Sequence, residues 1–138
     1  MPPEICLAKH VHHIAIAVVD IDDAIGFYHR TFGSPIPHVE TVADQKVKAC
    51  LIPIGTTHLE LIQPLDQEST VAKFIQRRGE GLHHICFQVD HLQEKLDSLA
   101  SSGFELVDSA PRTGLAGNIA FIHPRSTRGI LIELIEKP

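Results

Sequence analysis

The sequence contains one short pattern twice, at residues 12–18 and again at 83–89. The first copy reads His-His-Ile-Ala-Ile-Ala-Val and the second reads His-His-Ile-Cys-Phe-Gln-Val. A second pattern follows each copy, Leu-Glu-Leu-Ile at 59–62 and Ile-Glu-Leu-Ile at 132–135. Self-similarity at a long interval indicates duplicated structural units. The chain is therefore predicted to contain two related modules, each beginning with a His-bearing strand and ending with a Glu-bearing strand.

Hydrophobic periodicity predicts the order βαβββ for the first module. Residues 11–19 alternate in character, which places His13 on the face opposite to the isoleucines. Apolar residues at helical spacing predict a helix at 21–32, with Asp20 as its N-cap and Gly33 as its C-cap. Three further strands are expected at 36–42, 46–54 and 57–63.

The second module repeats this order after its own His-bearing strand. Asp90 is predicted to cap a helix that ends at Gly103, with Gln93 completing a capping box. Residues 111–117 are expected to form a loop, because they contain a proline and two glycines. Strands are expected near 104–108, 118–123 and 129–135.

The length of 138 residues suits a single domain with a core of its own. A linker helix at about 67–80, capped by Ser69 and ended by Gly79, is expected to join the modules. The predicted fold class is α+β, with the two modules paired about a pseudo-twofold axis into a curved half-open barrel. The predicted parts of this domain (1–138) are module one at about 10–66, the linker helix, and module two at about 81–138.

Four residues match across the repeat, His13 with His84 and Glu60 with Glu133. Taken singly, a strand His or Glu is more often a core or surface residue than a metal ligand. Two buried carboxylates at equivalent positions, however, would need a cation. Two imidazoles and two carboxylates suit a six-coordinate divalent ion with two positions left for water or substrate. The sequence therefore predicts one metal centre built from these four side chains.

The other histidines and the cysteines are given structural roles. His12 and His83 point away from their ligand neighbours and are expected to be structural. Surface or loop positions are expected for His10, His29, His38, His58, His91 and His123. Three cysteines without a CxxC spacing indicate reduced thiols rather than a disulfide framework, with small core residues expected at Cys50 and Cys86.

Charge and hydropathy exclude several classes of protein. A net charge of −5 without a Lys/Arg run gives no surface for nucleic acid. No apolar run approaches the roughly 20 residues of a membrane span, and the first residues lack the basic and apolar regions of a secretory signal. A cytoplasmic protein with a small-molecule ligand, and without a nucleic-acid or membrane partner, is expected.

At these residues the chain resembles the vicinal-oxygen-chelate superfamily and, within it, the methylmalonyl-CoA epimerase family. The most specific matching segments lie at 65–74, 79–85, 121–126 and 129–134. The paired His/Glu pattern by itself indicates only the superfamily, whereas the long middle and late segments favour the epimerase.

The resemblance implies an isomerase that interconverts (2R)- and (2S)-methylmalonyl-CoA by α-proton abstraction through a metal-stabilised thioester enolate. Its ligand positions fall on His13, Glu60, His84 and Glu133, of which the second is Gln or Glu among relatives. It also implies that Glu133 is both a ligand and a catalytic base. The implied cofactor is a divalent ion, with Co²⁺ favoured and Mn²⁺, Ni²⁺ or Zn²⁺ also suitable. The implied partners are an acyl-CoA substrate and a second copy of the chain in a homodimer.

The chain departs from the family pattern at one place. Some relatives carry a second glutamate on the third strand of module one, whereas residues 47–50 here read Val-Lys-Ala-Cys. The second acid/base is therefore unassigned, and Lys48 is expected on the outer face of its strand. Contacts to the CoA phosphates are open to several guanidinium groups, those of Arg77, Arg78, Arg112, Arg125 and Arg128.

Three alternatives are open within the same superfamily. A glyoxalase I-type lactoylglutathione lyase would use a similar His/Glu set on a glutathione hemithioacetal. An extradiol dioxygenase would need Fe²⁺ and only one carboxylate beside two histidines, so two carboxylates argue against it. A non-catalytic ligand-binding protein of the antibiotic-sequestering kind commonly lacks metal, which a complete four-ligand set disfavours.

Overall fold

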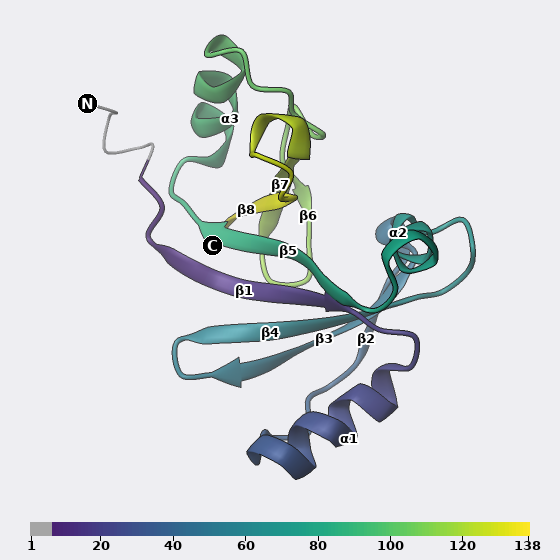
Figure 1. Cartoon of the computed structure of the whole chain (residues 1–138). Coiled ribbons are helices and arrows are strands. Elements are labelled where there is room, and N and C mark those ends of the chain that lie inside the picture. The colour runs from purple at the N-terminus through teal and green to yellow at the C-terminus, as the bar shows by residue number, and fades with distance from the viewer. Residues whose placement is uncertain (1–6) are drawn as a thin grey trace. The chain divides into compact units, whose positions relative to one another are not determined.

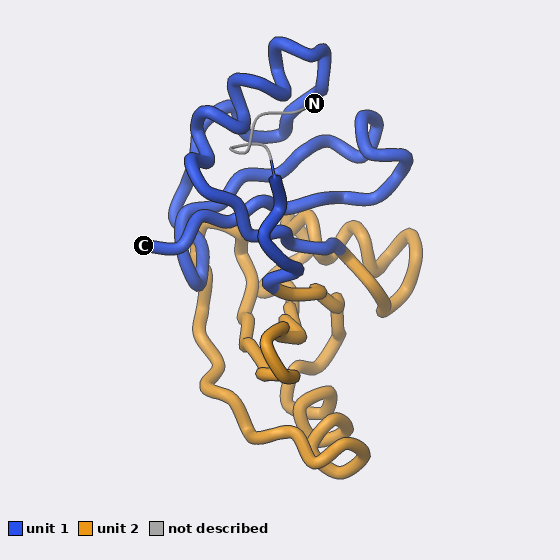
Figure 2. Tube along the Cα trace, turned by 90° about the vertical axis from the view of Figure 1, so that its left-hand side faces the viewer, with its two compact units in different colours: residues 1–12, 84–138 blue, residues 13–83 orange. Residues whose placement is uncertain are grey.

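The computed structural model describes residues 7–138, and these form two compact units. One unit comprises residues 13–83, and the other comprises residues 84–138 together with the segment that ends at His12. Figure 1 labels the helices and strands, and Figure 2 colours the two units. Each unit contains one of the two predicted modules.

The unit of residues 13–83 has the predicted βαβββ order, followed by a helix. Its strands are ordered β2-β3-β4-β1, and only the pair of β4 and β1 is parallel. Its elements are β1 (His10–Ala17, which enters this unit at His13), α1 (Ile21–Phe32), β2 (Glu40–Val42), the 3-10 turn η2 (Ala43–Gln45), β3 (Val47–Ile54), β4 (Thr57–Pro64) and α2 (Thr70–Arg78).

The other unit repeats this topology. Its strands are ordered β5-β8-β7-β6, and only the pair of β5 and β8 is parallel. Its elements are β5 (Gly81–Gln88, mostly in this unit), α3 (Leu92–Ser101), β6 (Arg112–Thr113), β7 (Asn118–Ile122), the 3-10 turn η3 (Pro124–Ser126) and β8 (Ile132–Glu136). The duplication predicted from the sequence is therefore present in the backbone of each unit.

Helix α1 begins and ends at the predicted residues. The Asp20 carboxylate accepts a hydrogen bond from the Asp23 N–H at 3.1 Å, which satisfies one of the free donors of the first turn. Gly33 has a φ of 71°, and its N–H donates to the His29 carbonyl. A left-handed residue at this place is favourable for glycine because it has no Cβ.

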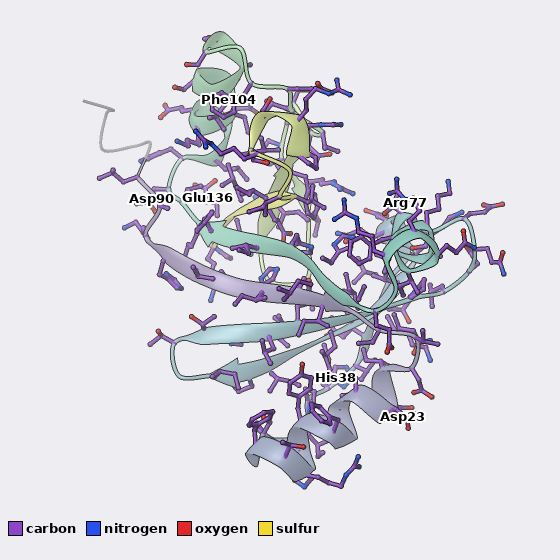
Figure 3. The ribbon with its side chains drawn as sticks, in the orientation of Figure 1. Asp23, His38, Arg77, Asp90, Phe104 and Glu136 are labelled. Carbon is purple, nitrogen blue, oxygen red and sulfur yellow. The ribbon has the colours of Figure 1, made fainter. Side chains whose placement is uncertain are left out.

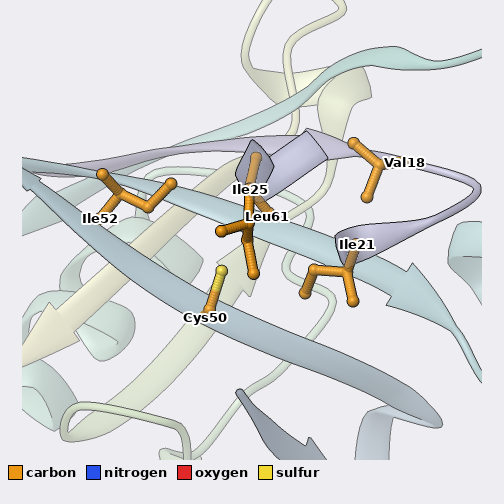
Figure 4. Close-up of a cluster of buried hydrophobic side chains, with 6 residues drawn as sticks. All are labelled: Val18, Ile21, Ile25, Cys50, Ile52 and Leu61. Atoms are coloured by element: carbon orange, nitrogen blue, oxygen red, sulfur yellow. The ribbon is translucent and has the colours of Figure 1, made fainter. Parts of the chain in front are cut away.

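One face of β3 and β4 packs against α1 (Figure 4). Cys50 and Ile52 of β3 lie with Leu61 of β4 in this cluster, and all three are at most 1% exposed. The helix and the chain that leads into it supply Val18, Ile21 and Ile25. Successive strand residues point to opposite faces, so the residues between these apolar ones, including Glu60, face away from α1.

The N-terminus of α3 is capped differently from the prediction, which was wrong about Asp90. The N-cap position is His91, and its side chain makes no capping hydrogen bond. The Glu136 carboxylate instead accepts from the N–H groups of His91 and Leu92, at 3.1 and 3.3 Å. Asp90 pairs with Lys9 at 3.0 Å, so its carboxylate is engaged elsewhere; Asp90 and Glu136 are both labelled in Figure 3.

In the first module, a neutral side chain from the last strand caps the helix in the same way. The Gln63 side-chain oxygen accepts from the N–H of Ile21, the first residue of α1, at 2.9 Å. Gln63 follows Glu60 by three positions on β4, as Glu136 follows Glu133 on β8. The strand that carries each glutamate of the repeat is thereby tied to the start of the helix in its own unit.

The strand predicted at 36–42 is shorter, because β2 begins only at Glu40. Pro35 and Pro37 precede it, and proline has no N–H to donate to a strand ladder. The linker helix predicted at about 67–80 is α2 at Thr70–Arg78, with the predicted cap, because Ser69 Oγ accepts from the Val71 N–H.

The strand predicted at 104–108 is wrong. An isolated bridge joins Leu106 to Ile122, and β6 forms at 112–113 inside the predicted loop. The Asp108 side chain accepts from the Phe121 N–H at 2.9 Å, where a regular strand would present a backbone carbonyl. A short side chain that hydrogen-bonds the backbone in this way competes with a regular ladder.

We expect Glu136→Ala to lower the free energy of unfolding by about 1–2 kcal/mol, because it leaves two N–H groups at the start of α3 without their acceptor. Asp90→Ala removes only a surface ion pair, so its cost should stay below about 0.5 kcal/mol. Urea unfolding with an unchanged m-value measures both. Equal costs for the two variants would contradict the assignment of the cap to Glu136.

Candidate functional site

In the unit of residues 13–83, His13 and Glu60 form a buried pair on the sheet face opposite to α1. His13 Nε2 lies 3.5 Å from Glu60 Oε1, and the two side chains are 4% and 12% exposed. The pairing of β1 with β4 places Ala15 beside Glu60, and Ala15 and Ala17 are fully buried. Small residues therefore lie beside the pair on this face of the sheet.

In the other unit, His84 and Glu133 form the equivalent pair. His84 Nε2 lies 2.9 Å from Glu133 Oε1, and both side chains are at most 6% exposed. The pairing of β5 with β8 places Cys86 beside Glu133, as Ala15 lies beside Glu60. The structure therefore brings together each predicted His with the predicted Glu of its own module.

Each pair has donor atoms that could hold a divalent metal ion. Imidazole nitrogen and carboxylate oxygen bind such ions at about 2.0–2.2 Å. Two ligands at right angles on one ion would then have donor atoms about 3 Å apart, by simple geometry from those bond lengths. The separation of 2.9 Å in the His84–Glu133 pair agrees with this spacing, and the separation of 3.5 Å in the His13–Glu60 pair corresponds to a wider ligand angle. Each pair could therefore supply two ligands to one ion.

A chain of contacts runs from His84 through three further residues. The Phe121 ring meets the His84 ring edge to face, with centroids 5.2 Å apart and planes at 87°. The Arg112 guanidinium lies over the Phe121 ring, 5.5 Å from its centroid. Asp108 Oδ1 lies 3.3 Å from Arg112 Nε. Arg112 was a candidate for binding phosphate. Phe121 begins one of the segments that carry the family resemblance, at 121–126, but no role was predicted for it or for Asp108.

The remaining histidines lie where the sequence predicted for the most part. His10, His29, His38 and His91 are exposed, and His58 and His123 are half-buried. His12 is 3% exposed, and the half-buried ring of His83 contacts Phe74 at 4.9 Å between centroids. Lys48 shares the strand face of Cys50 rather than that of Glu60, which agrees with the prediction that it lies away from the site.

The two cysteines within the described residues are free and buried, as predicted for core residues. Burial raises the pKa of the Cys50 thiol to about 11, from an ordinary value of 9.0. A thiol with such a pKa has little thiolate at neutral pH, so Cys50 is not suited to act as a nucleophile. Cys6 lies outside the described residues.

The chain belongs to the Glyoxalase/Bleomycin resistance protein/Dioxygenase superfamily, whose family model matches residues 12–122. The superfamily and the α+β fold class were both predicted from the sequence and are confirmed. Within this superfamily the predicted resemblance to methylmalonyl-CoA epimerases is also confirmed, by the relatives described next.

Among relatives, the chain is 46% identical over 129 residues to the uncharacterized protein YqjC of Bacillus subtilis, covering 93% of this chain and 92% of that protein. It is 32% identical over 127 residues to the ethylmalonyl-CoA/methylmalonyl-CoA epimerase of Cereibacter sphaeroides, covering 90% of this chain and 95% of that protein.

Solved structures agree with these relatives. The methylmalonyl-CoA epimerase of Mycobacterium tuberculosis matches with a TM-score of 0.91 and 36% identity, covering 96% of this chain and 90% of that one. A methylmalonyl-CoA epimerase in complex with methylmalonyl-CoA and ammonium matches with a TM-score of 0.90 and 30% identity, covering 95% and 96%. The fold of this chain is therefore that of structurally known epimerases.

Within residues 7–138, none of the helices has both the length and the apolar character that crossing a membrane as a helix would require.

We expect the Cys50 thiol to resist alkylation by iodoacetamide at pH 9 in the folded protein and to react when the chain is unfolded in urea, because its pKa is raised to about 11. Peptide mass spectrometry identifies the labelled residue. Well below pH 9 the thiol is neutral in both the folded and the unfolded chain. Between pH 9 and 11 the unfolded chain loses this proton more readily, so Cys50 should lower the free energy of unfolding progressively over that range. Equal labelling rates in folded and unfolded protein would contradict its burial.

Proposed function

We propose that this chain is a metal-dependent epimerase that interconverts (2R)- and (2S)-methylmalonyl-CoA. The observation that carries the proposal is the presence of two buried His–Glu pairs at equivalent positions of the two modules. Relatives and solved structures named as epimerases of methylmalonyl-CoA support the choice of substrate.

The proposed centre combines the two pairs around one divalent ion, with His13, Glu60, His84 and Glu133 as its ligands. Its chemical support is the donor set, because two imidazoles and two carboxylates satisfy four positions of an octahedral ion and leave two for substrate oxygens. Burial supports it too, since the exposed fractions of Glu60 and Glu133 are only 9% and 5%. Buried carboxylates favour a neighbouring cation. Co²⁺ is our preferred ion, with Mn²⁺, Ni²⁺ and Zn²⁺ as suitable replacements.

The reaction requires removal of an acidic proton and its return on the opposite face of the same carbon. That carbon lies between a thioester and a carboxylate, so negative charge left by the proton spreads onto oxygen. A bound divalent ion would supply Lewis-acid stabilisation of that charge. The chain itself must place a base close to the α-carbon and keep water away from it.

Glu133 is the residue to which we assign the base, with the α-proton moving to one of its carboxylate oxygens. The resemblance implies this role, and the buried position beside His84 supports it. Exclusion of water around Glu133 comes from its apolar neighbours on the same sheet face, the buried side chains of Cys86, Ile119, Phe121 and Ile135. The second acid/base is unassigned, because the β3 residues on the face of Glu60 include no acidic or basic side chain; they are Val47, Ala49, Leu51 and Pro53.

The remaining expectations from the sequence and from the resemblance are part of this proposal. The two modules would form one domain, the protein would act as a homodimer, and it would work in the cytoplasm on an acyl-CoA substrate. Of all parts of the proposed function, the shared metal centre can be tested most directly.

We expect chelator-stripped protein to take up one Co²⁺ per chain and to gain thermal stability, because an ion that binds only the folded state stabilises it by mass action. His13→Ala and His84→Ala should each abolish this uptake, since both pairs hold the same ion. His38→Ala is a matched control, because His38 lies near Glu40 in an exposed pair at 3.8 Å. Metal analysis and melting curves measure the outcome. Two ions per chain, with one retained in each single variant, would contradict the shared centre.

We expect Glu133→Gln to slow exchange of the α-proton of methylmalonyl-CoA in D₂O by about 10²–10⁴-fold, because a general base contributes on this order. Glu60→Gln makes the same chemical change at the equivalent position, where the family tolerates Gln, and should cost less than about tenfold. NMR follows deuterium uptake, and metal content is measured for both variants.

Two results would count against these assignments. Equal losses in the two variants would contradict the choice of Glu133 as base. Absence of exchange in fully metallated wild-type protein would contradict the epimerase itself. The same sample would then be offered the glutathione hemithioacetal of methylglyoxal, the substrate of a glyoxalase I-type enzyme.

A further inference from the structure

Arg112 lies on the same sheet face as the His84–Glu133 pair. Phe121 of β7 pairs with Glu133 of β8, and Ile119 of β7 pairs with Arg112 of β6. Residues that oppose one another or are two apart on a strand share a face, so this register places Arg112 on the face of Glu133. Strands lie about 4.8 Å apart, so the two backbones are separated by roughly 10 Å across β7.

The guanidinium is held in place from two sides. It lies over the Phe121 ring at 5.5 Å, and that ring contacts the His84 ring at 5.2 Å. Asp108 approaches Nε of Arg112 with one carboxylate oxygen, while its other oxygen accepts from the Phe121 N–H. The charge is therefore fixed relative to the ring that contacts a proposed ligand.

The same contacts leave the guanidinium able to bind an anion. The Asp108 contact is an ion pair without hydrogen-bond geometry, since Arg112 Nε has no hydrogen-bond partner within the described residues. The Arg112 side chain is 36% exposed, so it is neither buried in the core nor fully solvated. A guanidinium offers a planar pair of N–H donors that matches a carboxylate.

The equivalent position in the first module has the opposite charge. Glu40 of β2 pairs with Ala49 of β3, and Leu51 of β3 pairs with Glu60 of β4. Glu40 therefore occupies the same position relative to Glu60, across the middle strand, as Arg112 occupies relative to Glu133. The two His–Glu pairs are chemically alike, but a negative charge lies on the sheet face of one pair and a positive charge lies on the sheet face of the other. An anionic group is favoured beside Arg112 and disfavoured beside Glu40.

We propose that Arg112 binds the free carboxylate of the acyl group and so selects carboxylated acyl-CoA thioesters over uncarboxylated ones. This inference rests on the proposed function. The carboxylate is borne by the carbon whose proton is removed, so it lies close to Glu133 whenever that carbon does. The CoA phosphates lie at the far end of the pantetheine arm, away from the reacting carbon. Asp108 is the positioning residue that orients the guanidinium.

The test compares two thioesters that differ only by the carboxylate, methylmalonyl-CoA and propionyl-CoA. Dissociation constants are measured by calorimetry on metal-loaded protein. Arg112→Met keeps an unbranched side chain but removes the charge and the N–H donors, and it should weaken methylmalonyl-CoA binding by about 10–100-fold while leaving propionyl-CoA unchanged. Asp108→Asn should weaken methylmalonyl-CoA selectively, by less. Arg30→Met, an exposed arginine of α1, is the matched control.

The outcomes separate this proposal from the one on which it rests. Equal weakening of both thioesters by Arg112→Met would place Arg112 on the part of CoA that they share and would overturn the carboxylate contact. Unchanged binding of both would overturn it as well. If wild-type protein bound neither thioester, the proposed function would fail, and this inference with it. Melting curves of each variant show whether the fold is retained, and the ratio of the two dissociation constants is insensitive to a general loss of folded protein.

Discussion

The burial of two glutamates is the constraint on which the arrangement of each sheet depends. A carboxylate that is only 5–9% exposed must have compensating partners, because removing it from water costs several kcal/mol. In each module the parallel pairing of the first and last strands brings an imidazole to within 3.5 Å or less of that carboxylate. Strand alternation then directs the apolar residues of the same strands onto a helix. In each module, the pairing of the first strand with the last strand therefore determines both which residues form the His–Glu pair and which residues pack on the helix.

The sequence predicted the features that depend on short-range patterns. The bounds of α1 followed from Asp20, Gly33 and the spacing of its apolar residues, all of which act within the helix itself. The His–Glu pairs followed from the repeat, because nearly equal intervals in the sequence indicate equivalent positions in the two modules. The superfamily followed from the same pattern together with longer matching segments.

Two of the failures arose where a distant side chain replaced a local one, whereas the late start of β2 has a local cause in Pro35 and Pro37. Asp90 and Gln93 have the spacing of a capping box, yet Glu136 supplies the cap from another strand. The bond from Phe121 to the Asp108 side chain interrupts the strand expected near 104–108. Such contacts join residues 13 to 45 positions apart, so no local pattern records them. The surroundings of His84 were missed for the same reason, because Phe121 and Asp108 acquire their significance only from the register of β6, β7 and β8.

The opposite charges at Glu40 and Arg112 distinguish two modules that otherwise repeat each other. Each module carries one imidazole and one carboxylate, half of the proposed ligand set. Two identical copies of one module would present identical groups to anything bound beside their ligand pairs. Two modules within one chain have separate sequences, so β2 and β6 can carry unlike side chains while the His–Glu pairs stay alike. The duplicated chain can therefore give chemically like ligand pairs different electrostatic surroundings.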